Sequence, residues 1–165
     1  MRHGEAANIV GDDSLRILTE QGVFEAKTMG QWLLLNSPKL LDIFVSPYIR
    51  AQQTCANVSS SLIKASLFTN QPKTLDLITP SGNAPQVHDF LDGLFSQYNT
   101  TDLDDKNSAV LFVSHMPFVS YFVAELTEKH QMPIFSTGSI AVIDYDTKRM
   151  KGQLVDIMSP DKLAN

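Results

Sequence analysis

Blocks of hydrophobic and polar residues alternate along the chain, and they predict helices and strands in turn. Residues 18–36, LTEQGVFEAKTMGQWLLLN, place apolar side chains at helical spacing, with Thr19 ahead of them as an N-cap. A short β-branched and aromatic run, DIFVSP at 42–47, predicts a strand. Residues 47–64 predict a second helix, in which Ser46 is the cap and a proline occupies the first position, where a missing N–H costs nothing.

The second half of the chain continues this alternation. Residues 84–98 predict a helix, and a polar loop follows at 99–108. The run AVLFVSHMP at 109–117 is almost continuously apolar, which is typical of a strand in a sheet covered on both faces. Residues 117–130 predict another helix, and residues 139–157 predict a hairpin closed by a polar turn.

The order of these elements predicts one domain over residues 1–165, an α/β fold with a three-layer α/β/α sandwich around a mostly parallel mixed sheet. A chain with 43% hydrophobic residues and this length buries a sizeable core. The net charge of −5 argues against a nucleic-acid binder that works by bulk electrostatics. No apolar run approaches the ~20 residues of a membrane span. These features predict a soluble, cytoplasmic protein without nucleic-acid or membrane partners.

Two of the predicted strands end in a small polar residue directly before a helix. The segments are FVSPYIR at 44–50 and FVSHMPFV at 112–119. Because the carboxyl ends of strands in open α/β sheets face the ligand crevice, we expect Arg50, in the first turn of its helix, and His115, at its strand tip, to reach one pocket.

The opening segment MRHGEAANIV would supply a third strand tip of this kind. Arg2, His3 and Gly4 would stand at its end, provided that an apolar strand precedes them. Only Met1 precedes them in this sequence. We therefore expect the first strand of the sheet to be missing from the start of the chain. If the protein begins at Met1, we expect a weakened sheet and a loosely held His3.

Three motifs give the chain a family resemblance. R-H-G-E at 2–5, S-P-Y-I-R-A-Q-Q-T at 46–54 and S-H-M-P at 114–117 occur in the order seen in the histidine phosphatase superfamily, the phosphoglycerate-mutase-like group. The finer pattern resembles the short bacterial phosphohistidine phosphatases of the SixA type. Its segments here are LTEQG, TPSGN, FVSYFVAEL, FSTGSIA and MSP.

The resemblance implies a role for each residue at the three strand tips. His3 is then the nucleophile, which carries the phosphoryl group as a covalent intermediate. Arg2 and Arg50 bind phosphate oxygens through planar guanidinium groups, and His115 donates to the transferring group as a protonated imidazole. Gly4 lets the backbone pass close to the phosphate. We expect neither metal nor cofactor, because these cations already balance the phosphate charge.

The chain departs from the superfamily in one respect. Many members carry a glutamate between the second and third motifs that protonates an alkoxide leaving group. The corresponding region here is TLDLITPSGN at 74–83, where Leu77 and the neighbouring Asp76 stand, and no general acid is assigned. Imidazole titrates near ~6.5 and is expelled more easily than an alkoxide, which favours a phosphohistidine substrate.

The sequence therefore predicts a metal-independent phosphohistidine phosphatase that acts on a phosphorylated protein. The resemblance implies a histidine-containing phosphotransfer domain as the substrate and a shallow, open site on a monomeric enzyme. Two alternatives stay open, a small-molecule phosphomonoesterase and a non-catalytic phosphoprotein-binding module. His88 and His130 are interpreted as surface or packing residues, and Cys55 as a small buried hydrophobe.

Overall fold

The computed structural model describes residues 1–8, 10–36, 39–98, 108–128 and 131–163. Most of the polar loop expected at 99–108, together with His130, lies outside them. The helices are α1 (Glu20–Asn36), α2 (Ile49–Lys64), α3 (Ala84–Phe95), α5 (Phe118–Leu126) and α6 (Pro160–Leu163), with 3-10 helices η1 (Asp13–Leu15) and η2 (Asp76–Ile78). The strands are β1 (Lys39–Val45), β2 (Lys73–Thr74), β3 (Ser108–Val113), β4 (Ile140–Asp146) and β5 (Lys151–Met158).

The strands form two separate ladders. β1 lies between β2 and β3, and both pairings are parallel. β4 and β5 form the antiparallel hairpin expected from residues 139–157, and Asp146 closes its turn by accepting from the backbone N–H groups of Lys148 and Arg149. The mostly parallel mixed sheet predicted from the sequence is thus divided between β3 and β4.

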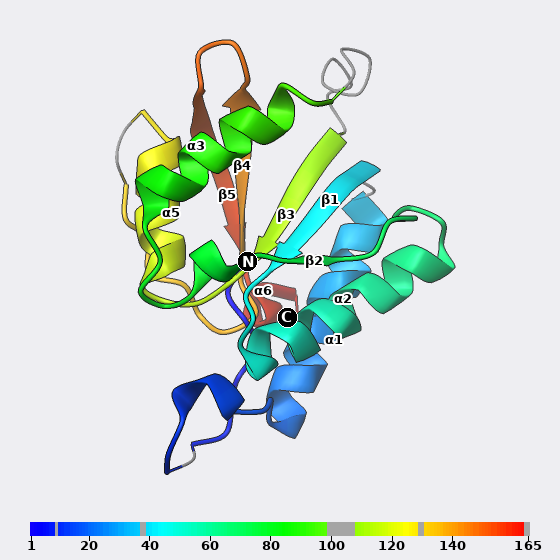
Figure 1. Cartoon of the computed structure of the whole chain (residues 1–165). Coiled ribbons are helices and arrows are strands. Elements are labelled where there is room, and N and C mark those ends of the chain that lie inside the picture. The colour runs from blue at the N-terminus through cyan, green and yellow to red at the C-terminus, as the bar shows by residue number, and fades with distance from the viewer. Residues whose placement is uncertain (9, 37–38, 99–107, 129–130, 164–165) are drawn as a thin grey trace.

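Helices cover the parallel ladder on both faces, as a three-layer sandwich requires (Figure 1). α1 and α2 pack against each other on one face, and α3 and α5 do so on the other. Successive residues of β1 point into different cores, because side chains alternate along a strand. Ile43 and Val45 join the core under α1 and α2, whereas Phe44 joins the core under α3 and α5.

Residues 1–3 connect the two ladders. They bond to β3 and its extension on one side and to residues 138–139 on the other, so backbone hydrogen bonds fix His3 in both directions. The expectation of a loosely held His3 is therefore wrong. The bonds, donor first, are Met1 N to Phe112 O (2.7 Å), Ser114 N to Met1 O (2.9 Å), His3 N to Ser114 O (2.9 Å), Arg2 N to Ser139 O (2.9 Å) and Gly138 N to His3 O (3.0 Å).

A cavity of about 670 Å³ lies beside Met1. Residues of both β3 and β4 line it, and most of its lining side chains are apolar. The cavity explains why β3 is only half-buried over residues 108–110, although the sequence predicts a strand covered on both faces. The amino group of Met1 is buried at this position, and desolvation lowers its pKa to about 5.

The starts of two helices test the capping predictions. Thr19 caps α1 as expected, because its hydroxyl accepts from Gly22 N at 3.0 Å. The cap predicted at Ser46 is wrong, since α2 begins at Ile49 and its N-cap residue Tyr48 makes no side-chain cap bond. Ser46 has a different partner, the ring of His115. Among the described helices, none is long and apolar enough to cross a membrane.

Candidate active site

The four side chains predicted from the three strand tips meet at one place. Arg50 Nε donates to His3 Nε2 at 3.1 Å, and the rings of His3 and His115 lie 5.0 Å apart between centroids. Arg2 forms a parallel bridge with Ser114, the residue that follows β3. This bridge brings His3 beside His115, because each comes directly after a bridged residue. A pocket of about 370 Å³ opens here. Its lining residues are Arg2, His3, Glu5, Ala6, Asp13, Arg16, Arg50, Pro80, Met116 and Thr137.

His3 is held in the tautomer that a nucleophile needs. Its Nδ1 lies 2.6 Å from Gly4 O, which only accepts, so Nδ1 carries the proton. Its Nε2 receives the N–H of Arg50, which only donates, so Nε2 holds the free electron pair. Burial lowers the pKa of His3 to about 4, and the positive charges of Arg50, Arg2 and Arg16 act in the same direction. The ring is therefore neutral near pH 7.

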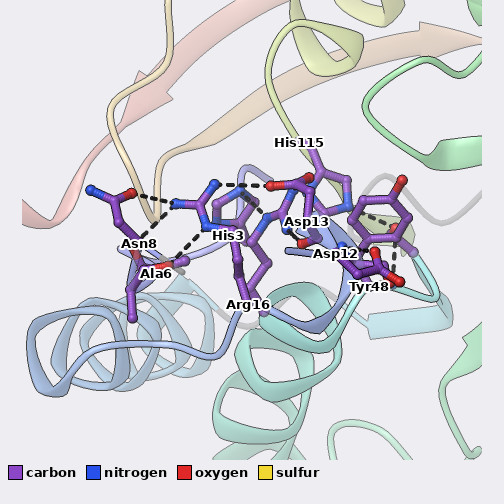
Figure 2. Close-up of polar contacts among 12 residues, drawn as sticks. His3, Ala6, Asn8, Asp12, Asp13, Arg16, Tyr48 and His115 are labelled. Carbon is purple, nitrogen blue, oxygen red and sulfur yellow. Dashed lines mark hydrogen bonds and ion pairs between the residues drawn. The ribbon is translucent and has the colours of Figure 1, made fainter. Parts of the chain in front are cut away.

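His115 lies behind the pocket and is almost fully buried. Its Nε2 is 2.7 Å from Ser46 Oγ, and the ring of Tyr48 packs beside it, as Figure 2 shows. Its Nδ1 is buried without a partner. Burial, followed by the charges of His3 and Arg50, lowers the pKa of His115 to about 3. The ring is thus neutral with these neighbours, and the protonated form expected beside a transferring phosphoryl group stays a prediction.

The two predicted arginines differ in what their guanidinium groups contact. Arg2 donates from Nη1 to Phe135 O at 2.5 Å, and its Nε is buried without a hydrogen-bond partner. Arg50 is only 3% exposed and uses all three nitrogens, one toward His3 and two toward Asp13. Its guanidinium also lies 5.0 Å from the centroid of the Tyr48 ring.

Sequence reasoning missed two charged residues of the pocket, Asp13 and Arg16. Figure 2 shows the Arg16 side chain between Asp13 on one side and Asn8 and Ala6 on the other. Arg16 pairs with Asp13 at 3.1 Å, and its remaining nitrogens donate to Ala7 O, Ala6 O and Asn8 Oδ1. No local pattern distinguishes these residues from solvated surface charges, because only the return of the chain from residue 7 to residue 17 brings them to the pocket.

Gly4 has a packing role that the sequence did not reveal. A Cβ atom at Gly4 would lie 2.4 Å from Gly22 O, and one at Gly22 would lie 2.0 Å from Glu5 O. The first turn of α1 therefore touches the backbone directly after His3. On the other side, Gly4 N donates to Thr54 Oγ1 of α2 at 3.0 Å. These contacts fix the carbonyl that accepts from His3 Nδ1.

The carboxyl groups near the pocket bear on proton donation. Asp76 and Leu77, the positions considered for a general acid, belong to η2 and are not among the lining residues. Hydrogen bonds from Arg50 and Arg16 lower the pKa of Asp13, so this carboxylate is ionised at neutral pH. Glu25 lies behind the pocket and accepts from Glu5 N at 2.8 Å. Across the described ranges, no group of three or more histidine, cysteine and acidic residues is placed to hold a metal ion.

Comparisons with known proteins agree with this geometry. No family model matches the chain. The phosphohistidine phosphatase SixA of Escherichia coli (strain K12) is 35% identical over 146 residues, which cover 88% of this chain and 83% of that protein. A SixA homolog of Haemophilus influenzae is 37% identical over 151 residues, with 88% and 86% covered. The structure of the protein histidine phosphatase SixA complexed with tungstate matches with a TM-score of 0.85 and 34% identity, over 99% of this chain and 96% of that one.

Proposed function

The chain belongs to the SixA-type phosphohistidine phosphatases of the histidine phosphatase superfamily, and we propose that it hydrolyses phosphohistidine on a protein with His3 as the nucleophile. In this proposal Arg2, Arg50 and His115 bind the phosphoryl group, and Gly4 keeps the backbone close to it. The observation that carries the proposal is the state of His3, a neutral ring whose Nε2 electron pair faces Arg50 in a pocket that Arg2 also lines.

Two buried nitrogens support an anion as the ligand. Arg2 Nε and His115 Nδ1 have no hydrogen-bond partner, and leaving a buried polar atom unpaired costs about 1–3 kcal/mol. A phosphoryl group supplies acceptor oxygens and negative charge at the same time. Its charge opposes the burial that keeps His115 neutral, so the ring takes up a proton when the anion binds and donates to it.

The reaction follows from these positions in two steps. His3 Nε2 attacks phosphorus, the P–N bond of the substrate breaks, and its electron pair stays on the departing imidazole nitrogen. Water then attacks the phosphorus of phosphorylated His3, which releases inorganic phosphate and restores the Nε2 electron pair. Arg50 Nε donates a hydrogen bond to this electron pair, with 3.1 Å between Arg50 Nε and His3 Nε2. This hydrogen bond therefore breaks before the attack. The guanidinium groups balance the charge on the transferring group in both steps.

The lack of an assigned proton donor for the leaving group favours phosphohistidine over an alkyl phosphate as the substrate. An alkoxide needs a proton as it leaves. In this proposal the proton of His115 is used in its hydrogen bond to the transferring phosphoryl group, ionised Asp13 has none to give at neutral pH, and no residue is assigned as the acid for a leaving group. Imidazole leaves as a neutral ring when its other nitrogen already carries a proton, and it titrates near ~6.5 in solution. We therefore propose a phosphorylated protein as the substrate, with a histidine-containing phosphotransfer domain as its expected form. A monomeric, cytoplasmic enzyme completes the proposal.

The test follows the phosphoryl group. Wild-type protein is mixed with a phosphohistidine-bearing phosphotransfer domain and quenched in alkaline denaturant, because the P–N bond survives base. We expect loss of substrate phosphohistidine and a transient phosphorylated enzyme. His3→Asn, whose amide can still donate to Gly4 O, should show neither while still binding inorganic phosphate.

The outcomes separate the alternatives. A wild type that binds phosphate but gives no turnover and no intermediate would be a phosphoprotein-binding module. Faster turnover of an alkyl phosphate than of the phosphorylated domain would identify a small-molecule phosphomonoesterase. Either result overturns the proposal.

A further inference from the structure

Asp13 occupies the part of Arg50 that a phosphoryl group would use. Arg50 Nη2 donates to Asp13 Oδ2 at 2.8 Å, and Nη1 donates to the backbone oxygen of the same residue at 2.5 Å. Arg50 is buried, so its orientation is fixed by these bonds and by the one to His3. Two parallel N–H···O bonds to a pair of oxygens are the arrangement in which guanidinium groups also bind phosphate.

The segment that carries Asp13 is exposed, whereas its arginine partner is buried. Asp13 lies in η1, a single 3-10 turn of three residues, and none of these residues is buried. Its side chain is 54% exposed, whereas that of Arg50 is 4% exposed. Asp13 also lines the pocket, so its carboxylate is a negative charge within the proposed phosphate site.

We propose that Asp13 is an internal competitor of the phosphoryl group, which sets the affinity of the pocket for phosphate by holding Arg50. Phosphate oxygens reach the Arg50 fork only after the pair with Asp13 has opened. The association constant for any phosphoryl ligand is therefore its intrinsic value multiplied by the fraction of molecules in which the pair is open. The carboxylate also repels a phosphate dianion in the same pocket, which acts in the same direction.

This role rests on the proposed function, in which it would promote release of the product. Inorganic phosphate is the product, and a pocket with two free arginines would retain it. A tethered carboxylate competes with the product as soon as water has cleaved the P–N bond to His3. Opening of the pair also involves the nucleophile, because the guanidinium that Asp13 holds is the one whose Nε covers His3 Nε2.

Asp12 provides a matched control. It is the neighbouring carboxylate in the same segment, and its Oδ1 accepts from Ser14 N at 2.9 Å rather than from an arginine. Asp12→Asn changes the net charge as much as Asp13→Asn does, and the amide oxygen preserves the cap. A difference between the two variants therefore reports the contacts of Asp13 with Arg50 and Arg16, and not the charge of the molecule.

The experiment measures the dissociation constant of inorganic phosphate by calorimetry for wild type, Asp13→Asn, Asp13→Ala and Asp12→Asn. We expect both Asp13 variants to bind phosphate about tenfold more tightly, which corresponds to about 1.4 kcal/mol. Asp12→Asn should stay within twofold of wild type. In steady-state assays with a phosphorylated domain, KM and the inhibition constant of phosphate should fall together in the Asp13 variants, without a rise in kcat.

Equal or weaker phosphate binding in both Asp13 variants would overturn the inference, because it would show that Asp13 orients Arg50 for the ligand. An equal gain in Asp12→Asn would overturn it too, because the effect would then be one of net charge. Circular-dichroism melts confirm that each variant is folded. The binding measurement needs no turnover, so its failure is distinguishable from a failure of the proposed phosphatase activity.

Discussion

Acid should destabilise this protein through its two active-site histidines. Burial lowers the pKa of His3 to about 4 and that of His115 to about 3, whereas both rings titrate near ~6.5 in an unfolded chain. At pH values between the folded-state and unfolded-state pKa values, each histidine is therefore protonated in the unfolded chain and neutral in the folded protein. The stabilisation by the neutral rings is complete above pH ~6.5 and is lost as the pH falls toward the folded-state values.

The size of the effect follows from these shifts. One pKa unit corresponds to about 1.36 kcal/mol, so complete titration removes about 3 kcal/mol through His3 and about 5 kcal/mol through His115. Between pH 7 and pH 5 the unfolded rings become protonated while the folded rings stay neutral. Each histidine then removes about 2 kcal/mol, and the two together remove about 4 kcal/mol, out of the 5–15 kcal/mol that is typical of a domain.

Urea unfolding at pH 7 and pH 5 measures this loss, and two amide variants assign it. His3→Asn keeps a donor for Gly4 O, and His115→Gln keeps a partner for Ser46 Oγ, but neither amide titrates. Each variant should lose about 2 kcal/mol less than wild type between the two pH values. The Met1 amine and the carboxyl groups titrate in all three proteins, so they cancel in the comparison. Equal losses in wild type and both variants would refute the reasoning.

A substitution and an N-terminal extension test how His3 is held. Gly22→Ala should lower the free energy of unfolding by about 1–3 kcal/mol and reduce kcat, because the added Cβ would lie 2.0 Å from Glu5 O. Thermal melts and phosphatase assays measure both effects. Gly93→Ala is the control, because its Cβ would meet open space. Joining six apolar β-branched residues to the amino group of Met1 should fill the cavity between β3 and β4 and raise both the melting temperature and activity. A glycine-serine extension of equal length should change neither, and equal effects would show that the cavity does not accept a strand.

The sequence predicted the fold and the four central residues because these depend on local patterns. Alternating apolar blocks predicted the helices and strands, and strand tips followed by helices predicted that Arg50 and His115 converge. The capping prediction failed at Ser46, where a local rule competed with a distant partner. Its hydroxyl bonds to the ring of His115, 69 residues away, and no pattern around residue 46 contains that information.

The protonation states of His3 and His115 could not be predicted from the sequence for a related reason. A histidine next to arginines is compatible with either protonation state until burial is known, and burial is the largest cause of the lowered pKa of both His3 and His115. Asp13 is the more instructive case. The segment from residue 7 to residue 17 closes by the bond from Ala7 N to Ile17 O, and this closure places a surface carboxylate on an arginine 37 residues away. The resemblance in motifs pointed to the groups proposed to hold phosphate, whereas the carboxylate proposed to compete with phosphate is found only from contacts that form in the folded chain.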